Sequence, residues 1–187
     1  MQELVCGVDE AGRGPIAGPV TAAAVILPAG FAVALLADSK VLSPSRRLAA
    51  AAVIREKALA WCVGWATHEE IDEINIHRAT LLAMLRAIRG LGVRPDRILV
   101  DGLHCPASDI PCTAIVKGDA TVHQIMAASI LAKTSRDAWM EGYSRLEPAY
   151  GFEKHKGYPT AEHRAAVIRL GPSRIHRRSF RVTAPSA

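Results

Sequence analysis

Two adjacent carboxylates stand where an apolar segment of the chain meets a glycine-rich turn. Asp9 and Glu10 follow Leu4-Val5-Cys6, a run typical of a short buried strand. Because neighbouring side chains of a strand point to opposite faces, both carboxylates reach one site only if the strand ends here and the backbone bends. Gly12-Arg13-Gly14 allows such a bend and adds a cation and open N–H groups. This combination predicts a metal-assisted, phosphate-handling site, and a solvated turn is the alternative.

Two more carboxylates follow later apolar segments. Asp101 ends the run Ile98-Leu99-Val100, and Asp119 stands at the start of a predicted long helix. If the strands before Asp9 and Asp101 are parallel neighbours, both carboxylates emerge at the edge where open α/β sheets bind ligands. Asp119 could reach the same edge. The alternatives are a turn residue before glycine for Asp101 and a helix N-cap for Asp119.

Together the four carboxylates predict a site for two divalent cations. Mg²⁺ and Mn²⁺ prefer oxygen ligands, and several carboxylates can hold two ions about 3.5–4 Å apart. One ion would lower the pKa of a water that attacks phosphorus, and the other would stabilise the leaving 3′-oxygen. The chain has seven histidines, but none has H-x-x-x-H spacing near these carboxylates, which argues against zinc.

The order of the predicted elements favours a mixed α/β sheet covered by helices. The expected strands are Leu4–Val8, Val20–Leu27, Trp61–Ala66, Arg97–Val100 and Thr113–Val116. The expected helices begin at Pro44, Asn75, Ala120 and Thr160 and end near Ala60, Gly90, Leu146 and Leu170. Ser43 has the position of an N-cap, and Thr67 and Glu70 have the spacing of a capping box.

Composition limits the class of protein. The 187 residues suit one domain with a sizeable core, and the net charge of +5 favours polyanionic partners. Six arginines crowd the C-terminal part, where a solvated basic face is the alternative: Arg164, Arg169, Arg174, Arg177, Arg178 and Arg181. The uncharged stretch between Arg13 and Asp38 is interrupted by Pro and Gly, so we expect a buried strand and a loop and no membrane span.

The cysteines and the N-terminus predict a reduced, cytoplasmic protein. The four cysteines show no C-x-x-C pairing, so no zinc or redox motif is visible: Cys6, Cys62, Cys105 and Cys112. Cys6 and Cys62 lie in apolar runs and are expected to be buried. Met1-Gln2-Glu3 lacks the basic start of a secretory signal.

The chain resembles ribonuclease HII, the type 2 ribonuclease H family, over essentially its whole length. The motifs that carry the resemblance are residues 7–15, Asp38-Ser39-Lys40, residues 129–133, Arg136-Asp137 and Lys156-Gly157-Tyr158. The resemblance implies an RNase H-like mixed five-stranded sheet flanked by helices. It implies one catalytic domain over residues 1–187, in which 149–187 form a C-terminal extension that contributes Tyr158. It further implies that Asp9, Glu10, Asp101 and Asp119 are catalytic and bind Mg²⁺ or Mn²⁺.

The resemblance also implies how the substrate is recognised. The backbone of Gly12, Arg13 and Gly14 would sense the ribose 2′-hydroxyl, and Tyr158 would pack against the sugar of the following deoxynucleotide. The remaining contacts would come from Lys40, Ser129, Lys133 and Arg136. The last three share a helix face at i, i+4 and i+7, where a solvated polar face is the alternative. Pro159 and Leu103 depart from the residues frequent in the family.

The implied activity is endonucleolytic cleavage of the RNA strand of RNA–DNA hybrids. It includes nicking 5′ to single ribonucleotides in duplex DNA, which leaves 5′-phosphate and 3′-hydroxyl ends. The expected partners are the hybrid and the ribonucleotide-containing duplex, and the protein is expected to be monomeric. A hybrid-cutting enzyme without single-ribonucleotide activity is the first alternative. The second is a non-catalytic nucleic-acid binder, which would gain nothing from carboxylates beside phosphate.

Overall fold

The computed structural model describes residues 3–36 and 43–181, which form a five-stranded mixed sheet flanked by helices. The strand order is β3-β2-β1-β4-β5. Strands β1 to β3 are antiparallel neighbours, whereas β4 runs parallel to β1 and β5 parallel to β4. The strands are β1 (Val5–Ala11), β2 (Val20–Ile26), β3 (Ala60–Ala66), β4 (Arg97–Asp101) and β5 (Cys112–Ile115). The predicted fold class is confirmed.

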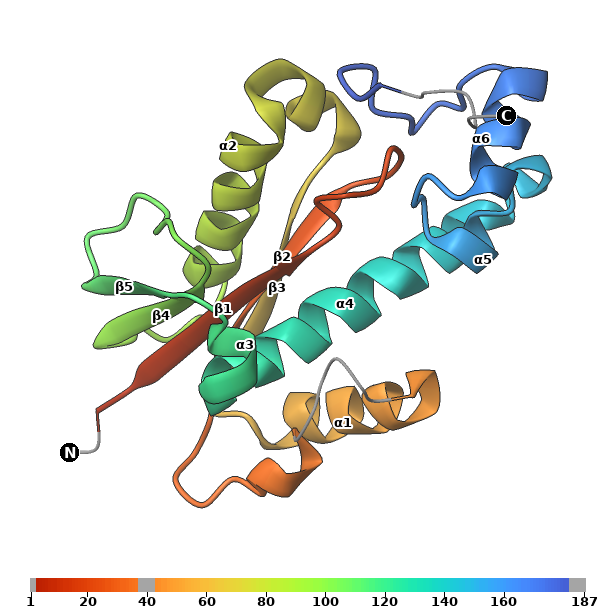
Figure 1. The fold of residues 1–187 in the computed structure, drawn as a ribbon. Helices are drawn as coiled ribbons and strands as arrows, with labels where there is room; N and C mark the ends of the chain where they lie inside the picture. The colour runs from red at the N-terminus through yellow and green to blue at the C-terminus, as the bar shows by residue number, and fades with distance from the viewer. Residues whose placement is uncertain (1–2, 37–42, 182–187) are drawn as a thin grey trace.

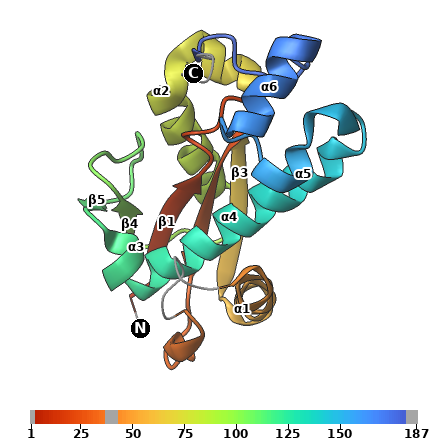
Figure 2. The ribbon, with the colours of Figure 1, turned by 45° about the vertical axis from the view of Figure 1, so that its right-hand side comes forward.

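Helices cover both faces of this sheet (Figures 1 and 2). Helix α2 packs on one face and α4 crosses the other, with α1 beside α4 and the α5–α6 segment near the C-terminal end of α4. The α-helices are α1 (Pro44–Lys57), α2 (His68–Arg89), α3 (Gly118–Thr121), α4 (His123–Ser144), α5 (Phe152–His155) and α6 (Ala161–Leu170). Two short 3₁₀ helices are η1 (Val33–Leu35) and η2 (Pro148–Tyr150).

Strand β2 is buried on both faces, which explains its continuous apolar sequence. Val20, Ala22, Ala24 and Ile26 join the core beneath α2. The alternate residues Ala23 and Val25 join a second core with α1 and α4. The uncharged stretch is therefore a buried strand, as predicted. Among the described residues, no helix has both the length and the hydropathy that crossing a membrane requires.

Local sequence signals place several helix ends correctly. Ser43 caps α1 by accepting a hydrogen bond from the Arg46 N–H, and Thr67 and Glu70 form the expected reciprocal capping box. Asn75 interrupts α2 with a positive φ of 67°, and its side chain caps the next turn at Arg78. As predicted, Asn75 starts a second helical segment, and a first segment of α2 precedes it from His68.

Two predicted boundaries are wrong. Strand β1 does not end at Val8 but continues to Ala11, because its antiparallel pairing with β2 extends to Thr21; only the parallel pairing with β4 stops at Val8. The predicted helix over 120–146 is divided at Val122, whose extended backbone separates α3 from α4.

The C-terminal segment packs against the loop that follows β1. Phe152 and Ile175 form a small buried cluster with Ala17 of that loop and Met140 of α4. Ala17 and His176 also form an isolated β-bridge. The last described residues therefore help to shape the first loop of the chain. The boundaries of the single domain and its extension stay a prediction.

Candidate active site

Strand pairing brings the first three carboxylates to one edge of the sheet. Val8 pairs with Val100, and both belong to the core under α2, so the residues that follow them, Asp9 and Asp101, point toward α4. Glu10 lies one residue further along β1. Asp119 joins them from α3, where its backbone N–H donates to Asp101 Oδ1 at 3.2 Å. Asp9, Glu10 and Asp101 thus lie close enough to influence one another's charge, and Asp119 approaches them through its backbone N–H; a common metal site for all four carboxylates stays a prediction.

The carboxylate cluster concentrates negative charge in a buried place. Burial, followed by the charge of Glu10, raises the pKa of Asp9 well above its ordinary value, and the Ser129 hydroxyl offsets part of the rise. Burial also raises the pKa of Glu10, although the Arg13 guanidinium 3.2 Å away favours its charged form. The cluster is therefore chemically suited to a bound cation, which would relieve this repulsion.

The donor set is all-oxygen, as Mg²⁺ and Mn²⁺ prefer. Within residues 3–36 and 43–181, however, no group of three or more His, Cys, Asp and Glu side chains is arranged so that it could hold a metal ion as it stands. Asp9 Oδ1 accepts from the Glu10 N–H at 2.7 Å, and Asp101 Oδ1 from the Asp119 N–H. The carboxylates as described therefore do not form a ready metal site, and cation binding by them stays a prediction.

A cavity of about 460 Å³ opens beside the carboxylates and gathers most of the predicted substrate residues. Its lining comprises Glu10, Ala11, Gly12, Arg13, Gly14, Arg47, Ser129, Ile130, Lys133 and Tyr158. The Tyr158 side chain is 42% exposed, and Lys133 Nζ lies 5.8 Å from the centroid of its ring. A larger cavity of about 720 Å³, near the C-terminal end of α2, contains none of the predicted residues.

Arg47 in the first turn of α1 is a cavity residue that the sequence analysis did not single out. In the sequence, Ser43-Pro44 predicted that a helix begins just before Arg47, but a helix start does not indicate that a residue lines a binding cavity. The predicted contact at Lys40 lies outside the described residues.

Arg136 does not face the cavity, so the prediction that it binds phosphate is wrong. Its side chain is 1% exposed, and its guanidinium donates to the backbone carbonyls of Ala17, Pro19 and Lys156. Ser129 and Lys133, two turns and one turn earlier on α4 respectively, do line the cavity. Helical periodicity could not show that two loops cover the end of this face.

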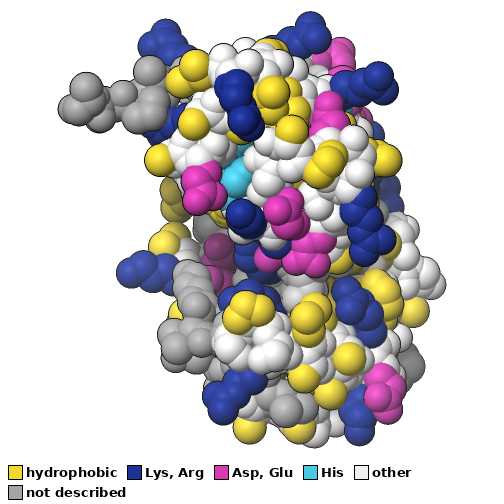
Figure 3. Space-filling view, turned by 90° about the vertical axis from the view of Figure 1, so that its right-hand side faces the viewer, with side chains coloured by type: hydrophobic (Ala, Val, Ile, Leu, Met, Phe, Trp, Pro, Cys, Tyr) yellow, Lys and Arg dark blue, Asp and Glu magenta, His cyan; other side chains and the backbone are white. Residues whose placement is uncertain are grey.

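Arg177 is a second buried guanidinium that the sequence placed in a basic surface cluster. It is 1% exposed and donates to the carbonyls of five residues in the first loop: Gly12, Arg13, Pro15, Gly18 and Pro19. Its neighbours Arg174 and Arg178 are exposed. On the face that Figure 3 shows, Lys and Arg side chains are spread among Asp and Glu side chains.

Three buried histidines form a cluster next to the backbone of Tyr158. His163 Nδ1 lies 2.8 Å from the Tyr158 carbonyl, and its Nε2 lies 3.0 Å from His176 Nε2. His176 Nδ1 accepts from the Ser173 N–H, and His155 Nδ1 from the Gly157 N–H. These partners assign one neutral tautomer to each ring, because only an unprotonated nitrogen accepts. Burial lowers the pKa of His163 and of His176 to about 4.

The histidine cluster predicts a loss of stability in mild acid. A histidine with a pKa of about 4 when folded and about 6.5 when unfolded binds fewer protons in the folded state between these values. Its stabilising contribution is complete above about pH 6.5 and is lost as the pH falls toward 4. A positive charge on the neighbouring His155 or His68 would lower the pKa of His176 further, whereas the Glu147 carboxylate raises it. We expect the unfolding midpoint to fall over this range, with a smaller fall in His163→Gln.

The thermal midpoint measured from pH 7 to pH 4 tests this expectation, with exposed His123→Gln as the matched control. Asp9 and Glu10, whose pKa values are raised, act in the opposite direction, since their charged forms lose favour on folding. The difference between each variant and the parent protein removes this common background. Equal slopes for His163→Gln and His123→Gln would contradict the prediction.

The comparisons with known proteins agree with the motifs. The family model described as Ribonuclease HII matches residues 6–183. Ribonuclease HII of Laribacter hongkongensis is 63% identical over 182 residues, which cover 96% of this chain and 92% of that protein. Ribonuclease HII of Dechloromonas aromatica is 58% identical over 177 residues, with coverage of 95% and 90%.

Solved structures show the same fold. Ribonuclease H2 from Pyrococcus horikoshii is 26% identical with a TM-score of 0.79, covering 95% of this chain and 94% of that chain. The RNase HII of the PCNA:RNase HII complex from Archaeoglobus fulgidus is 23% identical with a TM-score of 0.82, and the match covers 98% of each chain. The second similarity concerns the fold alone. By sequence and by fold, the chain belongs to the ribonuclease HII family of metal-dependent endoribonucleases, which act on RNA–DNA hybrids.

Proposed function

We propose that this ribonuclease cuts the RNA strand of hybrids and also nicks duplex DNA 5′ to a single ribonucleotide, using two divalent cations. One observation carries the proposal: a single cavity joins the Gly12-Arg13-Gly14 turn, the exposed Tyr158 ring and the carboxylate Glu10. Glu10 in turn interacts with Asp9 and Asp101. A ribose bound by the Gly12-Arg13-Gly14 turn and the following deoxyribose packed against the Tyr158 ring would thus lie beside the carboxylates.

The chain's own residues divide the work of recognition. The turn of Gly12, Arg13 and Gly14 would present its N–H groups to the sugar. Gly14 allows close approach because it has no side chain, whereas Arg136 fills the corresponding space at Gly12. The 2′-hydroxyl is the group that distinguishes ribose from deoxyribose, and it can donate to or accept from such a backbone. The half-exposed Tyr158 ring offers an apolar face to the next sugar. Lys133 and Ser129 would hold the phosphate between them, which makes binding sensitive to salt.

Four carboxylates would hold the cations: Asp9, Glu10, Asp101 and Asp119. When bound, the cations would supply a nucleophilic water at neutral pH and stabilise the leaving 3′-oxygen. The protein would hold the carboxylates on strand and helix ends and keep Asp9 and Asp119 away from bulk water. Such a mechanism yields 5′-phosphate and 3′-hydroxyl ends and needs no nucleophilic side chain.

A nicking assay tests the proposal directly. The substrate is a DNA duplex that contains one ribonucleotide. In Mg²⁺ or Mn²⁺ we expect the purified protein to nick it on the 5′ side of the ribonucleotide, and in EDTA we expect no cleavage. Either cation should also raise the thermal midpoint, since ligand bound to the folded state stabilises it. Cutting of long hybrids alone would favour the hybrid-only alternative. Duplex binding without turnover in either metal would favour a non-catalytic binder. The monomeric state and cytoplasmic location stay predictions.

A further inference from the structure

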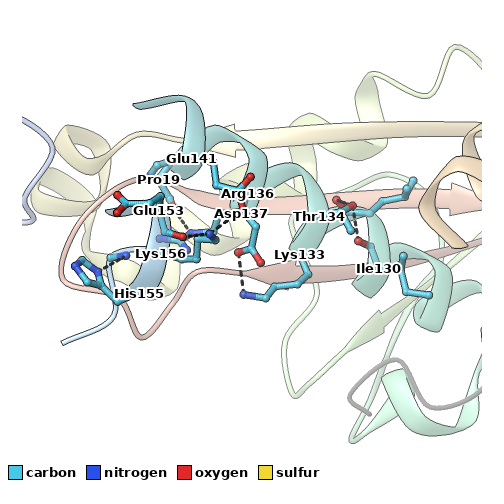
Figure 4. A network of polar contacts seen from close by, with 12 residues as sticks. Pro19, Ile130, Lys133, Thr134, Arg136, Asp137, Glu141, Glu153, His155 and Lys156 are labelled. Carbon is cyan, nitrogen blue, oxygen red and sulfur yellow. Dashed lines mark hydrogen bonds and ion pairs between the residues drawn. The ribbon is translucent and has the colours of Figure 1, made fainter. Parts of the chain in front are cut away.

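One buried side chain connects the two loops that the proposed function needs. We call residues 12–19 the glycine loop and residues 156–160 the tyrosine loop. From α4, Arg136 Nε donates to Pro19 O at 2.9 Å and one terminal nitrogen donates to Ala17 O at 3.1 Å, both in the glycine loop. The other terminal nitrogen donates at 2.9 Å to Lys156 O, two residues before Tyr158. Figure 4 shows Arg136 between Pro19 and Lys156.

We propose that Arg136 is a positioning residue that sets the placement of the glycine loop relative to the tyrosine loop, and thereby the preference for an RNA–DNA junction. This inference rests on the proposed function, in which one loop reads the ribose and the other the following deoxyribose. At an RNA–DNA junction, the ribose and the following deoxyribose are a fixed distance apart, so the two loops must be held at a matching distance. Within a long hybrid, the following nucleotide of the RNA strand is also a ribonucleotide, so the tyrosine loop meets no deoxyribose there.

The fit between Arg136 and the glycine loop is close. A Cβ on Gly12 would lie 2.1 Å from Arg136 Nε, and Gly12 also has a positive φ of 97°. The guanidinium thus occupies the space that a side chain at position 12 would need. Any shift of Arg136 would therefore be felt at the turn that we expect to sense the 2′-hydroxyl.

Other contacts keep the two loops together but do not replace Arg136. The Ile16 N–H donates to Gly157 O at 2.9 Å, which is a direct backbone link between the loops. Arg177 shares the Pro19 carbonyl with Arg136, but its other side-chain bonds stay within the glycine loop. Of the two buried guanidiniums, Arg136 is the one that bonds to both loops.

A guanidinium suits this role better than an ammonium. Its donors form a planar, rigid fork, so three carbonyls bound at once have fixed relative positions. A lysine donates from a single nitrogen on a flexible stem, so its three N–H groups do not reproduce the planar fork whose three nitrogens reach three separated carbonyls. Arg136→Lys therefore keeps the charge and removes the geometry, which makes it the sharpest variant. Arg145→Lys, at the exposed C-terminal end of the same helix, is the matched control.

The first test is hydrogen–deuterium exchange, which does not depend on catalysis. We expect Arg136→Lys to speed exchange by tenfold or more in both loops together, and Arg145→Lys to change neither. In the unaltered protein, the two loops should open as one unit, with the same dependence on low denaturant. Independent opening in the unaltered protein, which needs no variant to fold, would overturn the coupling. So would faster exchange in only one loop of Arg136→Lys.

The second test compares kcat/KM on a one-ribonucleotide duplex with kcat/KM on a long hybrid, below the unfolding range of each variant. Arg136→Lys should lose at least tenfold on the first substrate and less than threefold on the second, and Arg145→Lys should match the parent protein. Equal losses on both substrates would overturn the specificity role while leaving the nicking activity established. If the parent protein does not cut the one-ribonucleotide duplex at all, the proposed function fails and the junction role fails with it, whereas the exchange data still decide the coupling.

Discussion

Asp9→Asn should abolish cleavage while leaving hybrid binding nearly unchanged. The change removes one anionic oxygen from the cluster of four carboxylates but no contact to phosphate. Loss of a residue that merely supports a metal ligand costs about 10–100-fold in affinity or activity, and loss of a ligand should cost more. We therefore expect kcat to fall by more than about a hundredfold on every substrate. Gel assays of cleavage and a fluorescence titration of hybrid binding in EDTA measure the two effects.

The same variant should melt at an equal or higher temperature than the parent protein in EDTA. The raised pKa of Asp9 shows that its charge is unfavourable in the folded protein, because it is buried beside Glu10 and Asp101. Asparagine removes that charge at nearly constant volume. The rise in midpoint on adding Mn²⁺ should shrink or vanish. Asp109→Asn, an exposed carboxylate paired with Arg94 far from the cluster, should keep both cleavage and the Mn²⁺ response. Parent-like cleavage by Asp9→Asn would refute the proposed role of the cluster.

Tyr158→Ala should damage cutting at a single ribonucleotide much more than cutting within a long hybrid. The ring is 42% exposed at the edge of the cavity, so its removal takes away a contact surface and leaves the core intact. Stacking on one aromatic ring is worth about 1–3 kcal/mol. Since about 1.4 kcal/mol corresponds to a factor of ten, kcat/KM on the junction substrate should fall by about 5- to 150-fold.

Tyr158→Phe separates the ring from the hydroxyl. It keeps the apolar face and the 5.8 Å approach of Lys133, so it should retain most of the junction activity. Steady-state kinetics on the two substrates provide the measurement for both variants. Equal losses on both substrates in Tyr158→Ala would show that the ring does not read the junction. Full activity of Tyr158→Ala on the single ribonucleotide would remove Tyr158 from the site altogether.

The sequence by itself determined the fold class, the order of strands and helices, and two capped helix starts. Strand β2 was visible as a continuous apolar run because both of its faces are buried, and Ser43 and Thr67 marked helix starts because capping is a local interaction. Asp9 and Asp101 were identifiable because each directly follows an apolar run at a strand's carboxyl end. Such signals depend on residues close together in the chain, and the roles that the family motifs imply for these residues stay predictions.

The tertiary structure alone decided which polar side chains line the cavity and which hold the protein together. Ser129, Lys133 and Arg136 share one helical pattern, yet two loops from distant parts of the chain cover only Arg136. Arg177 looked like one of six C-terminal arginines until its five carbonyl partners, more than 150 residues away, were in place. The residue type alone does not show whether an arginine is exposed to solvent or buried among backbone carbonyls. Its role is set by the carbonyls around it, and long-range packing determines where those lie.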